Sequence, residues 1–284
     1  MSLSDPVFSH EWRSPDAPVP QRVGRFPVLE RVPDAGQGSQ GTVYRGQDPD
    51  TGASVAIKVL GDPLASFEGS VLASLVGESA LQELRREART LGGLRHPHIV
   101  PLVEVGEDPV QGAYLVTAWM PGGSLRARLD RAGKLPLGQA VGVCRDILSG
   151  LTAAHAAGLL HLDVKPENIL FDAEEHARLT DFGIAATMGE VTGAQAGRGT
   201  PGYMAPEQID PQRWAEVGPA TDLFAVGVVH YEMLSGHRPQ GDLQDALLEA
   251  PEPSRGLLAR ALVPRPSDRF PSADAMLQAL PDTR

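Results

Sequence analysis

Short runs of alternating apolar and polar residues indicate β-structure in the first part of the chain. The runs are bounded by Gly, Asp and Pro residues, which are typical of turns. Strands are predicted at 26–32, 42–45, 54–60, 99–105 and 113–119. Between the third and fourth of these, residues 79–94 instead carry apolar side chains at helical spacing, which predicts one helix.

After Pro121 the hydrophobic pattern has the period of a helix rather than that of a strand. The two strongest helical patterns cover 137–157 and 222–235. The order of elements therefore predicts an α+β chain, in which a small β-rich lobe with one helix precedes a larger helical lobe. Residues 1–25 hold four prolines and little periodicity, so we expect a flexible leader there.

The composition disfavours several classes of protein. The 284 residues are 42% hydrophobic and carry a net charge of −11 with no basic region, which argues against a large nucleic-acid interface. The longest apolar run, 223–234, contains His230 and Glu232 and is interpreted as a buried core helix rather than a membrane span. Without an N-terminal signal pattern, we expect a cytoplasmic protein. The single cysteine, Cys144, excludes an internal disulfide and is predicted to be a buried thiol.

Lysine and asparagine are unusually scarce. The chain has 22 Arg but only three Lys, and its one Asn is Asn168. This usage indicates a bias away from AT-rich codons. Under such a bias, the remaining Lys and Asn residues are expected where chemistry does not accept a substitute. Two of the three Lys and the only Asn fall within the motifs described next.

The first motif is a glycine-rich segment, Gly-Gln-Gly-Ser-Gln-Gly-Thr-Val at 36–43, followed by Val-Ala-Ile-Lys at 55–58. A lone Gly-x-Gly-x-x-Gly pattern is weak evidence, because flexible turns share it. Here a strand follows the glycines, whereas a dinucleotide-binding site would need a helix. Glycines at such a turn would let the backbone approach a polyphosphate closely.

The second motif is His-Leu-Asp-Val-Lys-Pro-Glu-Asn at 161–168, followed thirteen residues later by Asp-Phe-Gly at 181–183 and then by Ala-Pro-Glu at 205–207. The ordered set resembles the eukaryotic-type serine/threonine protein kinases that also occur in bacteria, over about residues 26–280. The resemblance implies a two-lobed protein-kinase-like fold, with a small antiparallel β-rich lobe at about 26–118 and a mostly helical lobe at about 121–284.

The resemblance also implies roles in phosphoryl transfer from ATP to a protein Ser or Thr hydroxyl, including autophosphorylation. Asp163 would orient the substrate hydroxyl and accept its proton, while Lys165 would neutralise charge on the transferred group. Asn168 and Asp181 would bind Mg²⁺, which prefers oxygen ligands.

Nucleotide binding is assigned to both lobes on the same basis. Lys58 would hold the α- and β-phosphates and pair with a Glu on the predicted helix. Periodicity alone does not choose between Glu83 and Glu87, which share a face, and the family register favours Glu87. The remaining nucleotide contacts would come from Gly36, Gly38, Gly41, Val43, Ala56, Ala118, Met120 and Leu170.

Three supporting contacts follow from the resemblance. Thr200 would form hydrogen bonds near Asp163 and Lys165. Glu207 would pair with Arg269 in a buried ion pair, and Asp222 would anchor the backbone of the catalytic loop, residues 161–168. The sequence Gly-Thr-Pro-Gly-Tyr at 199–203 and the Lys two residues after Asp163 are typical of serine/threonine rather than tyrosine kinases.

The chain departs from the family pattern at three places. Leu162 replaces the Arg that often precedes the catalytic Asp, and 62–77 is an insertion before the predicted helix. The segment 239–257 is short, so a partner-docking helix there is expected to be reduced or absent. A pseudokinase scaffold and a small-molecule phosphotransferase are the alternative interpretations of the sequence. If the chain phosphorylates itself, we expect the site in the activation segment, between Asp181 and Glu207, with Thr192 as the first choice and Thr187 as the second.

Overall fold

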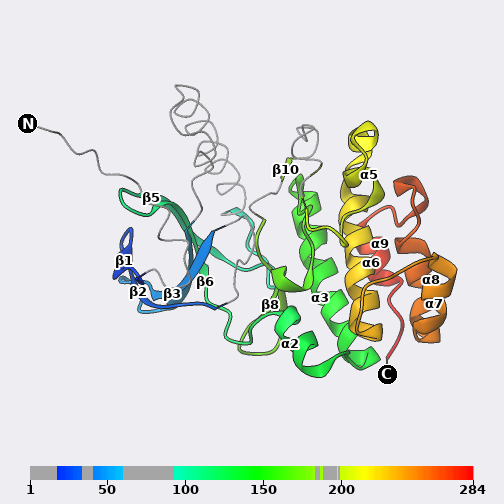
Figure 1. The fold of residues 1–284 in the computed structure, drawn as a ribbon, viewed down its shortest axis with the longest axis horizontal. Helices are drawn as coiled ribbons and strands as arrows, with labels where there is room; N and C mark the ends of the chain where they lie inside the picture. Colours follow the sequence, from blue (N-terminus) through cyan, green and yellow to red (C-terminus); the bar gives the residue numbers. More distant parts are fainter. Residues whose placement is uncertain are drawn as a thin grey trace, which may run out of the picture. The chain divides into compact units, whose positions relative to one another are not determined.

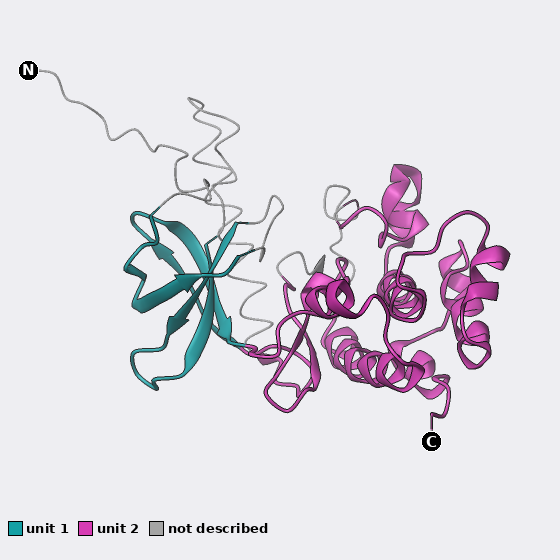
Figure 2. Cartoon of the chain, turned by 60° about the horizontal axis from the view of Figure 1, so that its bottom comes forward, with its two compact units in different colours: residues 1–85, 102–119 teal, residues 86–101, 120–284 magenta. Residues whose placement is uncertain are grey.

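The structure, a computed structural model, describes residues 18–33, 41–59, 93–182, 186–187, 197 and 199–283. The chain divides into two compact units (Figure 2): unit 1 consists of residues 1–85 and 102–119, and unit 2 of residues 86–101 and 120–284. Several sequence predictions fall outside the described residues, namely those for Gly36, Gly38, Glu83, Glu87, Thr192, the insertion 62–77 and almost all of the helix 79–94.

Six strands in the described part of unit 1 form an antiparallel sheet (Figure 1), in the order β1-β2-β3-β4-β6-β5. They are β1 (Arg22–Val23), β2 (Phe26–Arg31), β3 (Thr42–Gln47), β4 (Ser54–Val59), β5 (Leu102–Asp108) and β6 (Gly112–Ala118). Since β1 pairs with β2, the sheet begins within the segment that was predicted to be a leader. Val23 of that segment is fully buried.

Alternation along β4 determines which face of the sheet carries the core of unit 1. Val55, Ile57 and Val59 are buried, whereas Ala56 and Lys58 are half-buried on the opposite face. The buried side chains of β4 pack with those of the other strands, namely Val23, Phe26, Tyr44, Tyr114 and Val116.

The strand predicted at 99–105 begins three residues later than expected. Pro101 has no backbone N–H to donate to a sheet. The residues before it pair elsewhere: Val100 N–H donates to the carbonyl of Leu179, and Leu179 N–H donates to the carbonyl of His98, both within unit 2. The sequence pattern therefore joined a short bridge and β5 into one strand.

Unit 2 is mostly helical (Figure 1). The helices among its described residues are α2 (Leu125–Ala132), α3 (Leu137–Ala156), α5 (Pro206–Ile209), α6 (Pro219–Ser235), α7 (Leu243–Glu249), α8 (Glu252–Ala261) and α9 (Ala273–Gln278), with 3₁₀ turns η2 (Pro166–Asn168), η3 (Pro211–Glu216) and η4 (Pro266–Asp268). Short strands β7 (Leu159–Leu160) and β10 (Ala186–Thr187) pair with each other, as do β8 (Ile169–Phe171) and β9 (Ala177–Leu179).

Helix α6 lies in the core of unit 2 and is buried along almost its whole length. It begins three residues before the predicted start, because Pro219 suits the first turn of a helix, where no backbone N–H is needed. Its apolar residues pack with those of α3 in one core cluster, which agrees with the core-helix interpretation of 223–234. In the ranges that the structure describes, no helix is both long and apolar enough to span a membrane.

A polar network lies inside this core. Cys144 on α3 is fully buried, as predicted, and its Sγ is 3.1 Å from Nδ1 of His230 on α6. The Nε2 of His230 is 3.0 Å from the hydroxyl oxygen of Ser254 on α8. Burial raises the pKa of the Cys144 thiol and lowers the pKa of His230 to about 4, so both groups are neutral at pH 7.

The shortened segment 239–257 retains a small helix, α7, of seven residues. Its Ala246 and Leu247 are buried in the core cluster of unit 2. The segment in which a docking helix was expected to be reduced or absent therefore contains a helix of about two turns.

Candidate active site

The small-lobe residues expected to contact nucleotide share one face of the sheet. Val43 on β3 lies directly opposite Lys58 on β4, and Ala56 lies opposite Thr117 on β6. All four side chains are half-buried. Side chains of directly opposed antiparallel residues emerge on the same face, so these four form one surface opposite the buried core of unit 1.

The glycine-rich turn enters the described residues only at Gly41. Gly41 has a φ of +115°, a backbone conformation that side-chain-bearing residues rarely adopt. It directly precedes β3, whose second residue is the half-buried Val43. This conformation is consistent with a glycine requirement at the end of the turn.

Of the other expected adenine contacts, Ala118 and Met120 flank the point where the chain passes from β6 into unit 2, and Leu170 is on β8. Ala118 ends β6 in unit 1, and Met120 is buried in unit 2. Leu170 is half-buried on β8 and forms a bridge with Ser124.

Asp163, Lys165 and Thr200 form a closed triangle of polar contacts in unit 2. Lys165 Nζ lies 2.8 Å from Asp163 Oδ2 and donates a 2.6 Å hydrogen bond to Thr200 Oγ1. Thr200 Oγ1 in turn donates a 2.8 Å bond to Asp163 Oδ1. The predicted contacts of Thr200 are thus present. They place a carboxylate and an ammonium group side by side, with the Asp163 side chain only 2% exposed.

Asn168 ties the end of the catalytic loop to its start. Its Nδ2 donates to the backbone carbonyl of Asp163 at 2.8 Å and to the Asp163 Oδ2 at 3.1 Å. With Nδ2 used in this way, the Oδ1 of Asn168 is the atom available as an oxygen ligand. The Asn168 carbonyl also accepts a 3.0 Å hydrogen bond from Thr180 N–H, which holds the chain just before Asp181 beside Asn168.

His161 links the catalytic loop to the Asp181 segment. Asp163 N–H donates to His161 Nδ1 at 3.3 Å, so Nε2 carries the proton and donates to the Thr180 carbonyl at 2.9 Å. The His161 ring also lies 4.6 Å from that of Phe182. His161 is fully buried, so it is a packed residue of the core. Asp181 itself is in the left-handed region, with a φ of +60°.

The oxygen donors of Asn168 and Asp181 fit a hard cation such as Mg²⁺. They are an amide and a carboxylate from two adjoining segments of one unit. Within the described ranges, no group of three or more His, Cys, Asp or Glu residues could hold a metal ion. With Asn168 and Asp181 as its protein donors, a bound Mg²⁺ would take its other oxygen ligands from a bound molecule or from water, which is typical of Mg²⁺ in phosphoryl transfer.

Asp222 anchors the backbone of the catalytic loop, as predicted. Its two carboxylate oxygens accept hydrogen bonds from His161 N–H at 3.0 Å and Leu162 N–H at 2.8 Å, and His155 Nε2 lies 2.8 Å from Oδ2. Burial would raise the pKa of Asp222, but the hydrogen bond from His155, the nearby imidazoles and the backbone N–H groups outweigh it and hold that pKa below its ordinary value.

Leu162, which stands where many relatives have Arg, is 3% exposed. Its side chain forms a small apolar cluster with Leu160 and Val217. Its backbone has a φ of +63°, so the chain turns sharply just before Asp163. A Leu side chain has no hydrogen-bond donor, and this one is occupied in packing.

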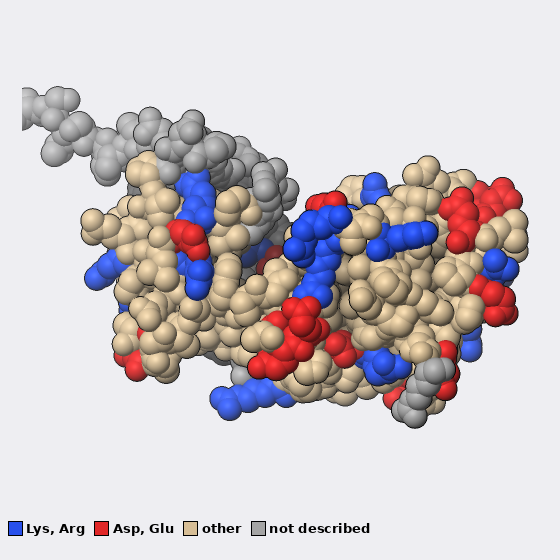
Figure 3. All heavy atoms as spheres, turned by 90° about the horizontal axis from the view of Figure 1, so that it is seen from below, with Lys and Arg blue, Asp and Glu red and all other residues tan. Residues whose placement is uncertain are grey.

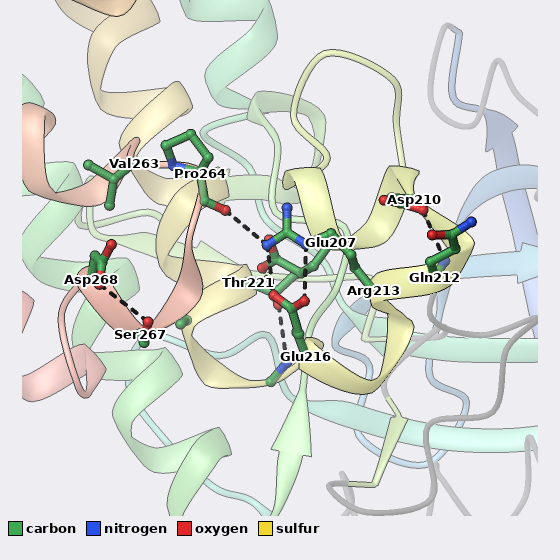
Figure 4. A network of polar contacts seen from close by, with 12 residues as sticks. Glu207, Asp210, Gln212, Arg213, Glu216, Thr221, Val263, Pro264, Ser267 and Asp268 are labelled. Carbon is green, nitrogen blue, oxygen red and sulfur yellow. Dashed lines mark hydrogen bonds and ion pairs between the residues drawn. The ribbon is translucent and has the colours of Figure 1, made fainter.

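The predicted ion pair between Glu207 and Arg269 is present and fully buried. Arg269 donates to both carboxylate oxygens of Glu207, at 2.7 and 2.9 Å, and Thr221 Oγ1 donates to Glu207 at 2.8 Å. Arg269 also donates to the carbonyl of Pro264. Figure 4 shows Glu207 beside Thr221 in this network, with the exposed pair Arg213 and Glu216 on neighbouring η3.

One residue of the site, Gln208, belongs to none of the motifs in the sequence. Its side chain bonds to the backbone of the catalytic loop 46 residues away. The only signal was its position directly after the Ala-Pro-Glu motif.

Charged side chains of both signs lie on the face of the molecule drawn in Figure 3. Figure 3 shows acidic and basic residues interspersed over one face of the molecule. This pattern agrees with the absence of a basic region in the sequence.

The chain matches the protein kinase domain family over residues 29–273. Among curated proteins, it is 39% identical over 218 residues to the serine/threonine-protein kinase PkaB of Streptomyces coelicolor, covering 72% of this chain and 48% of that protein. It is 35% identical over 258 residues to the serine/threonine-protein kinase PknL of Mycobacterium tuberculosis, covering 84% and 61%. It is 36% identical over 254 residues to PknE of Mycobacterium bovis, covering 83% and 42%.

The chain therefore belongs to the protein kinase domain family, and its fold class is the α+β protein kinase fold, with an antiparallel β-rich unit and a helical unit. The matched relatives cited above are bacterial proteins named as serine/threonine-protein kinases. The chain spans about half the length of these curated relatives.

Proposed function

We propose that this chain is a protein serine/threonine kinase that transfers the γ-phosphoryl group of ATP to Ser or Thr hydroxyls of proteins, with Mg²⁺ as its metal. The observation that carries the proposal is the arrangement of Asp163, Lys165 and Thr200, in which a buried carboxylate and an ammonium group lie 2.8 Å apart. Family membership and the names of the relatives support the same activity.

Asp163 is the proposed acceptor of the substrate proton. Lys165 and Asn168 both contact its Oδ2, while Thr200 contacts its Oδ1. These contacts orient the carboxylate, so that an incoming hydroxyl meets a fixed acceptor rather than a rotating one. Lys165 Nζ adds a positive charge at the same place, where it would offset negative charge on the transferred phosphoryl group.

The nucleotide and metal are assigned to residues whose chemistry fits them. Lys58, on the half-buried face of β4, would contribute a point charge to the α- and β-phosphates. Asn168 Oδ1 and the Asp181 carboxylate would hold Mg²⁺. When bound, the metal supplies neutralisation of phosphate charge. The chain's own part is to keep Asn168 and Asp181 together through the hydrogen bond from Thr180.

The test is transfer of radiolabel from γ-labelled ATP to a generic Ser- and Thr-containing protein, followed by acid hydrolysis and identification of the labelled amino acids. We expect phosphoserine or phosphothreonine and dependence on Mg²⁺. Label transferred faster to members of a small-molecule panel would indicate a small-molecule phosphotransferase instead. Nucleotide binding without any transfer would indicate a pseudokinase scaffold.

A further inference from the structure

Gln208 bridges two segments of the candidate active site through a single side-chain amide. Its Nε2 donates a 3.0 Å hydrogen bond to the carbonyl of Leu162, the residue before Asp163. Its Oε1 accepts a 3.0 Å bond from the backbone N–H of Ala205, at the end of the activation segment. The Gln208 residue is 2% exposed, so water does not compete readily for these bonds.

The residue type is closely specified by these two partners. One end of the side chain must accept from an N–H and the other must donate to a carbonyl, which an uncharged carboxamide does. An ionised Glu would keep the bond from Ala205 but would place negative charge against the Leu162 carbonyl. Met has a similar length and could make neither bond.

The peptide group between Leu162 and Asp163 is held at both ends. Its carbonyl accepts from Gln208, and its N–H donates to His161 Nδ1. The plane of this peptide sets the direction in which the Asp163 side chain leaves the backbone. Leu162 has a φ of +63°, which costs a residue with a side chain conformational energy, so surrounding contacts must maintain it.

At Gly199 the activation segment closely approaches the hydrogen bond between Gln208 and the Leu162 carbonyl. A Cβ at Gly199 would lie 3.1 Å from the Leu162 oxygen and 3.3 Å from Gln208 Nε2, and its φ is +141°. The next residue is Thr200, which donates to the Asp163 carboxylate. The Leu162 carbonyl and the Gln208 amide therefore adjoin both the backbone of Asp163 and the residue before Thr200, whose hydroxyl orients the Asp163 side chain.

We propose that Gln208 is a positioning residue for Asp163, which joins the catalytic loop to the end of the activation segment and maintains the reactive direction of the carboxylate. This inference rests on the proposed kinase function. In this chain, the side chain at 162 is apolar and packed, so the connection runs through the Leu162 backbone and needs no phosphate.

The experiment compares the variants Gln208→Met and Gln208→Glu with Gln212→Glu, a control that adds the same charge at an exposed position on η3. For each protein we would measure kcat, KM for ATP, ADP affinity, the thermal midpoint, and hydrogen exchange in the peptide that covers residues 160–165. The kinetic series runs from about pH 9 to about pH 6.

Gln208→Met is expected to lower kcat by about 10- to 100-fold, with ADP affinity unchanged and faster exchange at 160–165. Gln208→Glu is expected to lose kcat at high pH and to recover it as the pH falls, because a protonated Glu again donates to the Leu162 carbonyl. A merely structural role would change the thermal midpoint without this pH-dependent recovery. Gln212→Glu should match the wild type in every measurement.

Wild-type kcat in both Gln208 variants, or unchanged exchange at 160–165, would overturn the proposal. If Gln208→Met does not fold, the pH dependence of Gln208→Glu decides the question. A wild-type protein that transfers no phosphate would contradict the proposed function, and the exchange measurement would still show whether Gln208 holds the loop.

Discussion

Glu207 and Arg269 form a two-point ion pair in which both side chains are fully buried. The pair connects α5, at the end of the activation segment, to the residue that follows η4, across 62 residues of sequence. Arg269 additionally donates to the carbonyls of Val263, Pro264 and Ala220. Because every charged atom of this pair is enclosed by protein, its loss affects the stability of unit 2 far more than the loss of a surface pair.

Removal of one member of this pair should be strongly destabilising. Arg269→Met leaves the Glu207 carboxylate buried without its counter-charge, which costs about 3–5 kcal/mol of unfolding free energy. Urea denaturation measures the change. Arg213→Met is the matched control, because it removes the neighbouring exposed pair with Glu216 and is expected to leave the midpoint unchanged. Equal effects of the two substitutions would show that burial does not set the strength of the Glu207–Arg269 pair.

Stability should fall in mildly acidic solution because of His230. Its folded pKa of about 4 lies below its ordinary 6.5, so between these values the unfolded chain binds more protons than the folded chain. The unfolding free energy therefore decreases as pH falls from 6.5 toward 4, by a contribution on the order of 3 kcal/mol.

Urea midpoints measured across this pH range test the assignment. His230→Gln keeps a side chain that can form a hydrogen bond with Ser254 but cannot titrate, so its stability should decline less steeply with acid than that of the wild type. His237→Gln changes an exposed imidazole and should retain the wild-type slope. The account of His230 is wrong if His230→Gln and the wild type show parallel pH curves.

Dephosphorylation should leave the activity of this protein nearly unchanged. In many relatives, the Arg before the catalytic Asp binds a phosphate on the activation segment through paired charge-assisted hydrogen bonds. Leu162 has no donor and is packed against Leu160 and Val217. We therefore expect phosphatase-treated wild type and Thr192→Ala to transfer phosphate at the rate of untreated protein in an initial-rate assay. A large loss of rate in either sample would refute this expectation.

Lys58 should be essential for transfer and dispensable for folding. Its side chain lies on the half-buried face of β4, away from the core of unit 1, so Lys58→Met removes a charge without opening a cavity. We expect no measurable phosphate transfer together with an unchanged thermal midpoint. Lys134→Met, at an exposed position, is the control and should keep wild-type activity. Near-full activity in Lys58→Met would remove Lys58 from the site.

Contacts that depend on motif spacing could be predicted from the sequence. Thr200 with Asp163, Glu207 with Arg269, and Asp222 with the catalytic loop were all expected and are present. Each joins residues far apart in the chain, and no periodicity would reveal them. The family resemblance predicts which of these residues contact each other, whereas the hydrophobic pattern predicts only the helices and strands.

Contacts specific to this chain could not be predicted in the same way. The proposed role of Gln208 depends on the direction of the Leu162 carbonyl. That direction follows from a left-handed backbone at Leu162, which a Leu residue does not predict. The polar network of Cys144, His230 and Ser254 depends on how three helices pack. The start of β5 differs from the prediction because Pro101 ends one set of backbone hydrogen bonds, while the apolar pattern continues through it.

The turnover number of Asp163→Asn, measured beside its affinity for ADP, tests the central claim most directly. Asn keeps the size of the side chain and loses the carboxylate that would accept the substrate proton. The account predicts that kcat falls by about 10²- to 10⁴-fold while ADP affinity stays at the wild-type value. A variant that transfers phosphate to Ser and Thr at close to the wild-type rate would contradict the assignment of Asp163 as the catalytic base.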